Sequence, residues 1–283
     1  MTAKILEKQR LSEGVYLMVL SGAKIARKRK AGQFVVIRIH EQGERIPLTI
    51  ADADPAKGTV TIIFQVCGKS TSHLSDLNVG DEILDLVGPL GKPTHVEKIG
   101  TVACIGGGIG VAPVYPITQA MKQAGNRIIS IIGARNKELL IMEDEMKAVS
   151  DEIVVTTDDG SYGFHGFVSQ ALENNYLMKG IKIDLVVAIG PVPMMRAVCD
   201  ITRKYNVPTV VSLNSIMVDA TGMCGACRVS VGGKTRFACV EGPEFDGHQV
   251  DFKELIDRQR IYLADEKECM DHYCSCKLGK GST

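Results

Sequence analysis

Short runs rich in hydrophobic, strand-favouring residues cover the first part of the chain. They fall at residues 15–20, 34–40, 59–66 and 82–87, and glycine-containing turns separate them. Such runs are typical of strands, and closely spaced strands with little helix favour a small closed sheet. This pattern predicts an antiparallel β-barrel over residues 1–98.

The pattern changes after residue 99. Apolar runs at residues 101–105, 127–133, 152–157, 184–190 and 209–213 alternate with longer helix-like segments. Strands that alternate with helices form a parallel α/β layer, which we expect over residues 99–214. The uncharged run 99–121 is long enough to span a membrane, but its glycine cluster and two prolines favour a strand, a turn and the start of a helix.

Composition excludes several classes of partner. The 33 basic residues balance the 33 acidic ones, so nothing favours nucleic acid or an anionic membrane surface. Charged residues spread through the first twenty positions leave no apolar core for a secretory signal. Nine cysteines in a reducing compartment more plausibly bind metal or lie buried than form disulfides, so we expect a cytoplasmic protein.

The strongest chemical signal lies beyond residue 214. Asp219, Cys224, Cys227 and Cys239 follow the order D-x4-C-x2-C-x11-C, which departs from a plant-type 2Fe-2S spacing only at its first ligand. Glycines beside them let the backbone wrap a compact inorganic core. A zinc site with three cysteines is the alternative, and it would suit a zinc-stabilised ligand-binding module without turnover. Ser215 or a water could replace Asp219 as the fourth ligand.

The pattern therefore predicts a cluster module over residues 215–264 and a polar tail over residues 265–283. The tail carries Cys269, Cys274 and Cys276, which we expect to be exposed and reduced.

Three glycine-containing turns follow predicted strands of the α/β layer. Such a turn presents backbone amides and a helix dipole to a pyrophosphate, although a tight turn without a ligand would also explain one of them. Ligands of open parallel sheets bind at the carboxyl ends of the strands, so the three together favour a dinucleotide site. The candidate residues are Gly107, Gly108, Gly110 and Pro113 in the first turn, Asp158 and Gly160 in the second, and Gly190, Pro191 and Met194 in the third.

Two segments of the predicted barrel could hold a second pyrophosphate through an arginine fork and small donors. By themselves both are also compatible with ordinary surface structure. They are Arg45, Pro47, Leu48 and Thr49 in one, and Gly68, Ser70 and Thr71 in the other.

Taken in order, the segments RIPLT, GKSTSHL, GPLG, GGGIGVAP, DDGSYG, GPVPMM and the cluster segment resemble the ferredoxin-NADP reductase superfamily. They are most similar to the branch with the electron-transfer subunit of dihydroorotate dehydrogenase, the sulfide dehydrogenase β subunit and the small subunit of NADH-dependent reduced ferredoxin:NADP oxidoreductase. The resemblance implies that Arg45 contacts an FAD pyrophosphate, that residues 47–49 line the isoalloxazine, and that Gly68, Ser70 and Thr71 bind phosphate. It assigns Gly107 to Pro113, with Asp158, Gly160 and Gly190 to Met194, to the nicotinamide dinucleotide.

An aspartate at the first cluster position favours the bifurcating transhydrogenase over the dihydroorotate and sulfide branches, which commonly supply four cysteines. A flavin links a two-electron hydride donor to a one-electron cluster, so the expected order is NADH, FAD, 2Fe-2S. Hydride transfer needs no acid or base from the protein. The resemblance also implies a heterodimer with a larger flavin and 4Fe-4S subunit. Arg135 could hold a 2′-phosphate or lie on the surface, and the resemblance favours NAD(H).

Overall fold

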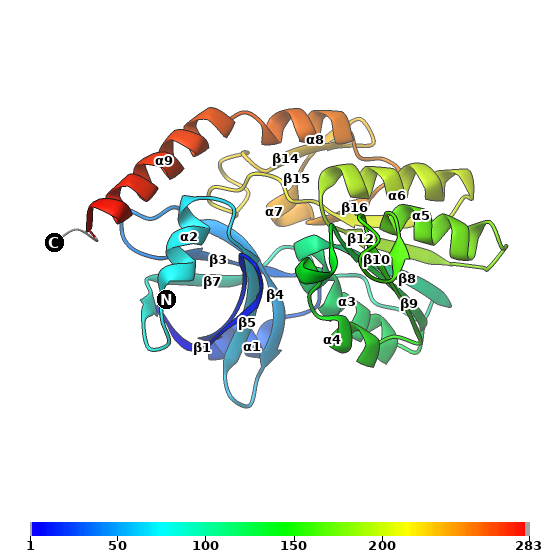
Figure 1. The fold of residues 1–283 in the computed structure, drawn as a ribbon, viewed down its shortest axis with the longest axis horizontal. Coiled ribbons are helices and arrows are strands. Elements are labelled where there is room, and N and C mark those ends of the chain that lie inside the picture. Colours follow the sequence, from blue (N-terminus) through cyan, green and yellow to red (C-terminus); the bar gives the residue numbers. More distant parts are fainter. Residues whose placement is uncertain (1, 281–283) are drawn as a thin grey trace.

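The structure is a computed structural model that describes residues 2–280, with side chains described as far as Ser275. Two seven-stranded sheets lie side by side, and a smaller C-terminal region lies along both (Figure 1). Within the described residues, no helix has the length and apolar composition needed to cross a bilayer. The uncharged run 99–121 forms a strand, a short turn of helix and most of an α-helix, as predicted.

The first sheet is a nearly closed antiparallel barrel, which confirms the predicted fold class. Its strands follow the order β6-β1-β2-β5-β4-β3-β7, and every neighbouring pair is antiparallel. The alternating positions Met18, Leu20, Val35, Ile37 and Ile62 point into its core. The strands are β1 (Ala3–Ser12), β2 (Val15–Ser21), β3 (Phe34–Arg38), β4 (Ile46–Asp54), β5 (Thr59–Gln65), β6 (Glu82–Ile83) and β7 (Asp85–Leu90), with helices α1 (Ala23–Lys28) and α2 (Lys69–Asp76).

The second sheet has the order β11-β10-β9-β8-β12-β13-β16, and all neighbours are parallel except β13 and β16. Both faces are covered, so its central strands are apolar throughout: Val102 and Cys104 pack with α3, and Ala103 and Ile105 pack in the core that includes α5 and α6. The strands are β8 (Thr101–Gly107), β9 (Arg127–Ala134), β10 (Glu152–Thr157), β11 (Phe164–His165), β12 (Leu185–Ile189), β13 (Thr209–Ser212) and β16 (Glu244–Asp246). The helices are α3 (Val111–Gln123), α4 (Glu143–Ala148), α5 (Val168–Leu172) and α6 (Val192–Lys204), with short helical turns η1 (Gly108–Gly110), η2 (Lys137–Leu139) and η3 (Glu173–Leu177).

The C-terminal region returns to both sheets. It contains the hairpin β14 (Arg228–Val231) and β15 (Lys234–Phe237), then α7 (Ala238–Glu241), β16, α8 (Phe252–Gln259) and α9 (Leu263–Lys280). Strand β16 pairs with β13, and Cys227 and Cys239 share a core with Phe252 and Leu255 of α8. The predicted polar tail is helical: α9 continues beyond α8 toward α2 of the barrel (Figure 1).

A partly buried carboxyl group lies where these parts meet. Thr94, in the segment between the two sheets, donates a hydrogen bond from Oγ1 to Oε1 of Glu244 on β16 at 2.5 Å. A Cβ atom on Gly32 of the barrel would collide with both side-chain oxygens, so the barrel backbone packs directly on this pair. Burial raises the pKa of Glu244 to about 7.

Candidate functional site

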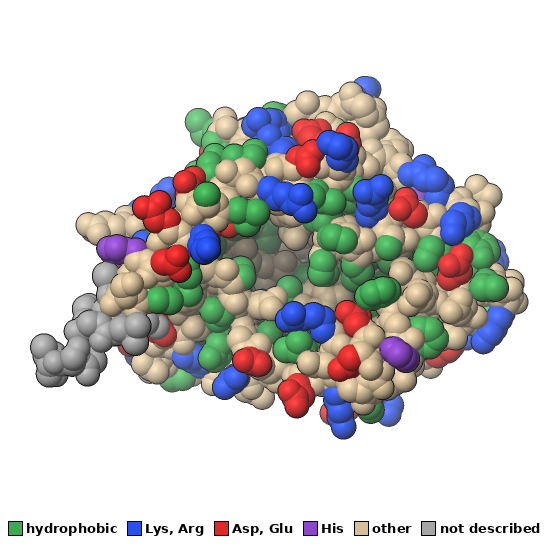
Figure 2. All heavy atoms as spheres, turned by 45° about the horizontal axis from the view of Figure 1, so that its top comes forward, with side chains coloured by type: hydrophobic (Ala, Val, Ile, Leu, Met, Phe, Trp, Pro, Cys, Tyr) green, Lys and Arg blue, Asp and Glu red, His purple; other side chains and the backbone are tan. Residues whose placement is uncertain are grey.

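A cavity of about 1060 Å³ lies between the barrel, the parallel sheet and the segment that follows β13. The space-filling view shows a hollow on this face of the molecule (Figure 2). The barrel contributes Val15, Phe34, Pro47, Thr49 and Gln65 to its wall. This volume is at the upper end of the range for small-molecule and cofactor sites.

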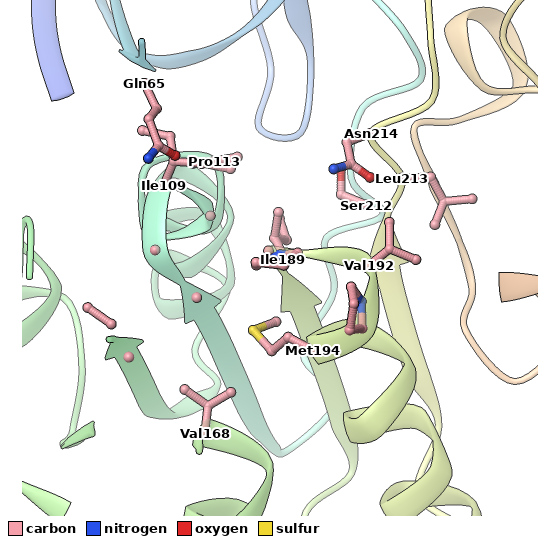
Figure 3. A pocket seen from close by; sticks show the side chains of 18 of the residues that line it. Gln65, Ile109, Pro113, Val168, Ile189, Val192, Met194, Ser212, Leu213 and Asn214 are labelled. Atoms are coloured by element: carbon pink, nitrogen blue, oxygen red, sulfur yellow. The ribbon is translucent and has the colours of Figure 1, made fainter. Parts of the chain in front are cut away.

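The cavity lies at the point where the strand order of the parallel sheet reverses. From β8 the chain proceeds to β9 on one side, whereas β12 pairs with β8 on the other side. The loops after β8 and β12 therefore diverge to opposite faces and leave a crevice at their carboxyl ends. Gly107 to Gly110 and Gly190 to Met194 line this crevice, and Figure 3 shows Ile189 between Ile109 and Val192.

Close packing of these two turns explains why they contain glycine. A Cβ atom on Gly107 would collide with Sδ of Met194, and one on Gly110 would collide with the carbonyl oxygen of Ile189. Gly108 has a φ of 55°, and its Cβ position faces open space. No side chain caps the first turn of α3, but the Val111 amide donates to the carbonyls of Gly108 and Ile109, and Pro113 has no N–H. An anionic group could therefore bind only the remaining amides of this turn.

The charged residues of the cavity lie near the carboxyl ends of β9 and β10. Arg135 follows β9 and Asp158 follows β10, and no other charged side chain of the described residues lines the wall. Burial raises the pKa of Asp158, the neighbouring Asp159 adds to that rise, and the Arg135 cation opposes it. Thr156 also lines the cavity, and its buried hydroxyl has no hydrogen-bond partner among the described residues. Such a group favours a polar ligand at this end.

The structure brings most of the predicted dinucleotide residues to one cavity. Gly107, Gly108, Gly110, Pro113, Asp158, Gly190, Pro191 and Met194 all line the cavity together with Pro47 and Thr49 of β4. Gly160, Arg45, Leu48, Gly68, Ser70 and Thr71 do not line it.

The two predicted barrel segments adjoin each other outside the cavity. Arg45 is exposed at the start of β4, and the neighbouring Glu44 accepts a hydrogen bond from the Ser70 hydroxyl at 2.6 Å. Gly68 is the N-cap of α2, and Thr71 Oγ1 accepts a hydrogen bond from its backbone amide at 3.1 Å. The residue before Arg45 thus contacts the N-terminal turn of α2, and the amides of such a turn suit a phosphate group.

The predicted cluster ligands lie on one loop and in the core beneath it. Cys227 and Cys239 are buried with their sulfur atoms 3.1 Å apart, and burial raises the pKa of the Cys239 thiol. Asp219 accepts hydrogen bonds from the backbone amides of Thr221 at 2.9 Å and Cys224 at 3.1 Å. These hydrogen bonds lower the pKa of Asp219, and the bond from Thr221 has the largest effect. The side chain is therefore an anionic carboxylate that could ligate a metal.

The donor types and the paired sulfurs fit an iron-sulfur cluster. Asp219 contacts the exposed Cys224 only through the hydrogen bond that the Cys224 backbone amide donates to its carboxylate. In the described part of the chain, no three Cys, His, Asp or Glu side chains converge on one metal position. Cluster binding therefore requires the loop to rotate these two side chains toward Cys227 and Cys239. Gly222 and Gly225, with φ values of 87° and 68°, allow this loop its left-handed turns.

Sequence reasoning missed part of the cavity wall. Phe34, Gln65 and Gln259 come from elements far apart in the sequence, and no local motif marks them. Asn214 and Ser215 directly follow β13, so the rule that ligands bind at strand carboxyl ends could have found them. Gln259 Nε2 donates to the Asn214 carbonyl at 2.9 Å and fixes this segment against α8.

An antiparallel barrel beside a parallel sheet, with two glycine turns at the strand reversal, defines a nicotinamide-dependent oxidoreductase of the ferredoxin-NADP reductase fold. Residues 104–200 match the oxidoreductase NAD-binding domain, and residues 214–251 match the iron-sulfur cluster binding domain of dihydroorotate dehydrogenase B. The second match favours an iron-sulfur cluster over the zinc alternative.

Whole-chain comparisons narrow the class further. The electron transfer subunit homolog of dihydroorotate dehydrogenase B from Thermotoga maritima is 48% identical over 93% of both chains. The corresponding subunit from Bacillus caldolyticus is 34% identical over 85% of this chain and 94% of that one. A solved structure of NADH-dependent reduced ferredoxin-NADP oxidoreductase superposes with a TM-score of 0.91 and 46% identity, covering 96% of this chain and 97% of that one. The chain belongs to the family of dihydroorotate dehydrogenase B electron transfer subunits and their homologues, and it is an oxidoreductase subunit.

Proposed function

We propose that this subunit passes electrons between NAD(H) and a larger redox subunit through FAD and a 2Fe-2S cluster, in an electron-bifurcating NADH-dependent ferredoxin:NADP transhydrogenase. The single observation that carries the proposal is the cavity. Pro47 and Thr49, the barrel residues expected to contact a flavin, line it together with both glycine turns. Bound FAD would supply the conversion between two-electron hydride chemistry and one-electron transfer. The task of the chain is then to hold the two ring systems in contact and exclude water.

We assign the FAD to β4 and the turn before α2. Pro47 and Thr49 line the cavity and would contact the isoalloxazine, with Leu48 between them on the strand. Arg45, Gly68, Ser70 and Thr71 would hold the pyrophosphate outside the cavity. The Ser70 hydroxyl donates its hydrogen bond to Glu44. To donate to an FAD phosphate instead, it would have to rotate away from this carboxylate.

We assign the dinucleotide to the crevice between β8 and β12. Backbone amides from Gly107 to Gly110 and the start of α3 would bind the pyrophosphate. Pro113 and residues Gly190 to Met194 would hold the nicotinamide half beside Pro47 and Thr49, because these groups line the same cavity. Asp158, with Gly160 in the same turn, would then face the adenosine half.

We assign the cluster to Asp219, Cys224, Cys227 and Cys239. The loop that carries them exposes apolar side chains, with Met223 88% exposed and Val218 57% exposed beside two of these residues. An apolar rim at a cluster suits a protein partner to which electrons pass. The proposed partner is a larger flavin and 4Fe-4S subunit in a heterodimer, and we place the complex in the cytoplasm, where cysteine ligands stay reduced.

The aspartate at the first cluster position favours the transhydrogenase over the second candidate, the electron transfer subunit of a dihydroorotate dehydrogenase. The solved transhydrogenase chain is 46% identical and the Bacillus and Geobacillus dihydroorotate subunits are 30–34% identical, whereas the Thermotoga homolog of that subunit is 48% identical. The test is anaerobic NADH titration of the purified complex, followed by its visible spectrum. Bleaching of a flavin band and then a cluster band supports the proposed order, and a colourless protein refutes it. Addition of dihydroorotate or of NADPH with ferredoxin then identifies the reaction.

A further inference from the structure

Helix α9 has an unusual relation to the rest of the chain. Of its described side chains, residues 263–275, only Met270 and Tyr273 are partly buried, and the others are exposed. A helix that is polar nearly all round adds little to a hydrophobic core, and its position depends on a few specific contacts. The contacts of Met270 and Tyr273 fall on helix α2 of the barrel.

The contacts between α9 and α2 are polar and well formed. Tyr273 donates a hydrogen bond from its hydroxyl to Asp76 Oδ2 at 2.7 Å, and its ring lies 6.2 Å from the His73 ring. Ser72 Oγ lies 3.8 Å from Met270 Sδ. Figure 1 shows α9 reaching α2 from α8, so it connects the C-terminal region to the barrel.

Helix α2 needs such support. It has eight residues, fewer than the roughly 12 to 15 at which isolated helices become even marginally stable in water. Only Ser72 and Leu74 of α2 are buried. The N-terminal turn of α2, Gly68 to Thr71, is the segment assigned above to the FAD pyrophosphate, and the position of its amides depends on how firmly the helix is held.

We infer that α9 is a strap that holds α2 in position and thereby slows the release of FAD from the barrel. The inference rests on the proposed FAD site. Tyr273 and Met270 are positioning residues, because they act through α2 and do not reach the cavity. The strap also links the cofactor of the barrel to the C-terminal region, since α9 is continuous with the segment that follows α8.

The test compares FAD release rates of full-length variants within the complex, measured by the gain of flavin fluorescence after dilution. Replacement of both contacts, Met270→Ala with Tyr273→Ala, should speed release about tenfold, and Tyr273→Phe, which keeps the ring, about threefold, as expected for loss of one to two modest interactions. The matched control is Tyr262→Ala, because Tyr262 is 51% exposed just before α9. Its release rate should equal that of the unmodified chain.

A merely structural role would alter more than FAD release. Iron content and the NADH concentration for half-maximal flavin reduction should stay unchanged in FAD-loaded variants. In a double-mutant cycle, Tyr273→Phe should add nothing once Asp76→Ala has removed the acceptor of their hydrogen bond. If the double alanine variant releases FAD at the normal rate while Arg45→Ala still lowers FAD affinity, the inference that α9 holds α2 in position is refuted. If Arg45→Ala also retains FAD normally, the FAD assignment itself fails.

Discussion

Glu244 makes the stability of the chain depend on pH in a direction unusual for a carboxyl group. Burial raises its pKa from 4.5 to about 7, so the folded chain holds this proton more tightly than the unfolded chain does. The stabilising contribution is complete below pH 4.5 and is lost as pH rises through about 7. One pKa unit corresponds to about 1.4 kcal/mol, so the loss amounts to at most about 3 kcal/mol.

Glu244→Gln removes the titration and keeps an oxygen that can accept the Thr94 hydrogen bond. Relative to the unmodified chain, the variant should therefore gain up to about 3 kcal/mol in unfolding free energy between pH 5 and pH 8. Urea unfolding at both pH values, followed by circular dichroism on cofactor-free protein, measures this difference.

Glu241→Gln provides the control. The backbone amide of Phe237 and then the Arg236 side chain lower the pKa of Glu241, so its stabilising contribution is complete above its unfolded pKa of 4.5 and is lost only as pH falls below that value. This variant should therefore differ from the unmodified chain by the same amount at pH 5 and at pH 8. The reasoning about Glu244 is refuted if Glu244→Gln shows the same difference from the unmodified chain at both pH values.

Three further predictions concern the assigned ligands. Arg45→Ala should raise the FAD dissociation constant about tenfold or more, through loss of a charge-assisted contact, with cluster content unchanged; full flavin retention would contradict it. Gly108→Val places a branched side chain in the open space at a φ of 55°, so NADH should reduce the flavin more slowly while FAD stays bound, which stopped-flow absorbance checks. Asp219→Cys should keep a 2Fe-2S cluster with a changed potential and paramagnetic resonance spectrum, and Asp219→Ala should make it labile; an unchanged cluster in Asp219→Ala would move the fourth ligand elsewhere.

The sequence predicted what depends on local pattern. The apolar runs of the parallel sheet fall on β8, β9, β10, β12 and β13, because strands buried on both faces are continuously hydrophobic. Strand β1 was not predicted, since only Ala3 and Ile5 of its ten residues are buried and no clear alternation results. Residues 82–87 were predicted as one strand, whereas the structure has β6 and then β7.

Contacts between segments far apart in the chain could not be predicted from the sequence. Nothing local indicates that β16 joins β13, that Thr94 meets Glu244, or that α9 reaches α2, because each depends on segments brought together only by the fold. The same applies to the cavity: its glycine turns were predicted, but the strand reversal that places them opposite each other is a property of topology. The domain boundaries and the individual ligand assignments remain predictions.

The pairing of β16 with β13 also bears on how the cluster is installed. The segment that carries the proposed ligands leaves the sheet after β13 and returns at β16, and the Leu213 amide donates to the Pro243 carbonyl at 2.9 Å where its two ends meet. It is thus a loop between the two strands at one edge of the sheet. Such a loop can open at a local free-energy cost, but Cys227 and Cys239 must then leave the core that they share with α8. Insertion of iron and sulfide would therefore disturb this edge and α8, and would leave the pairing of the central strands β8, β9 and β12 intact.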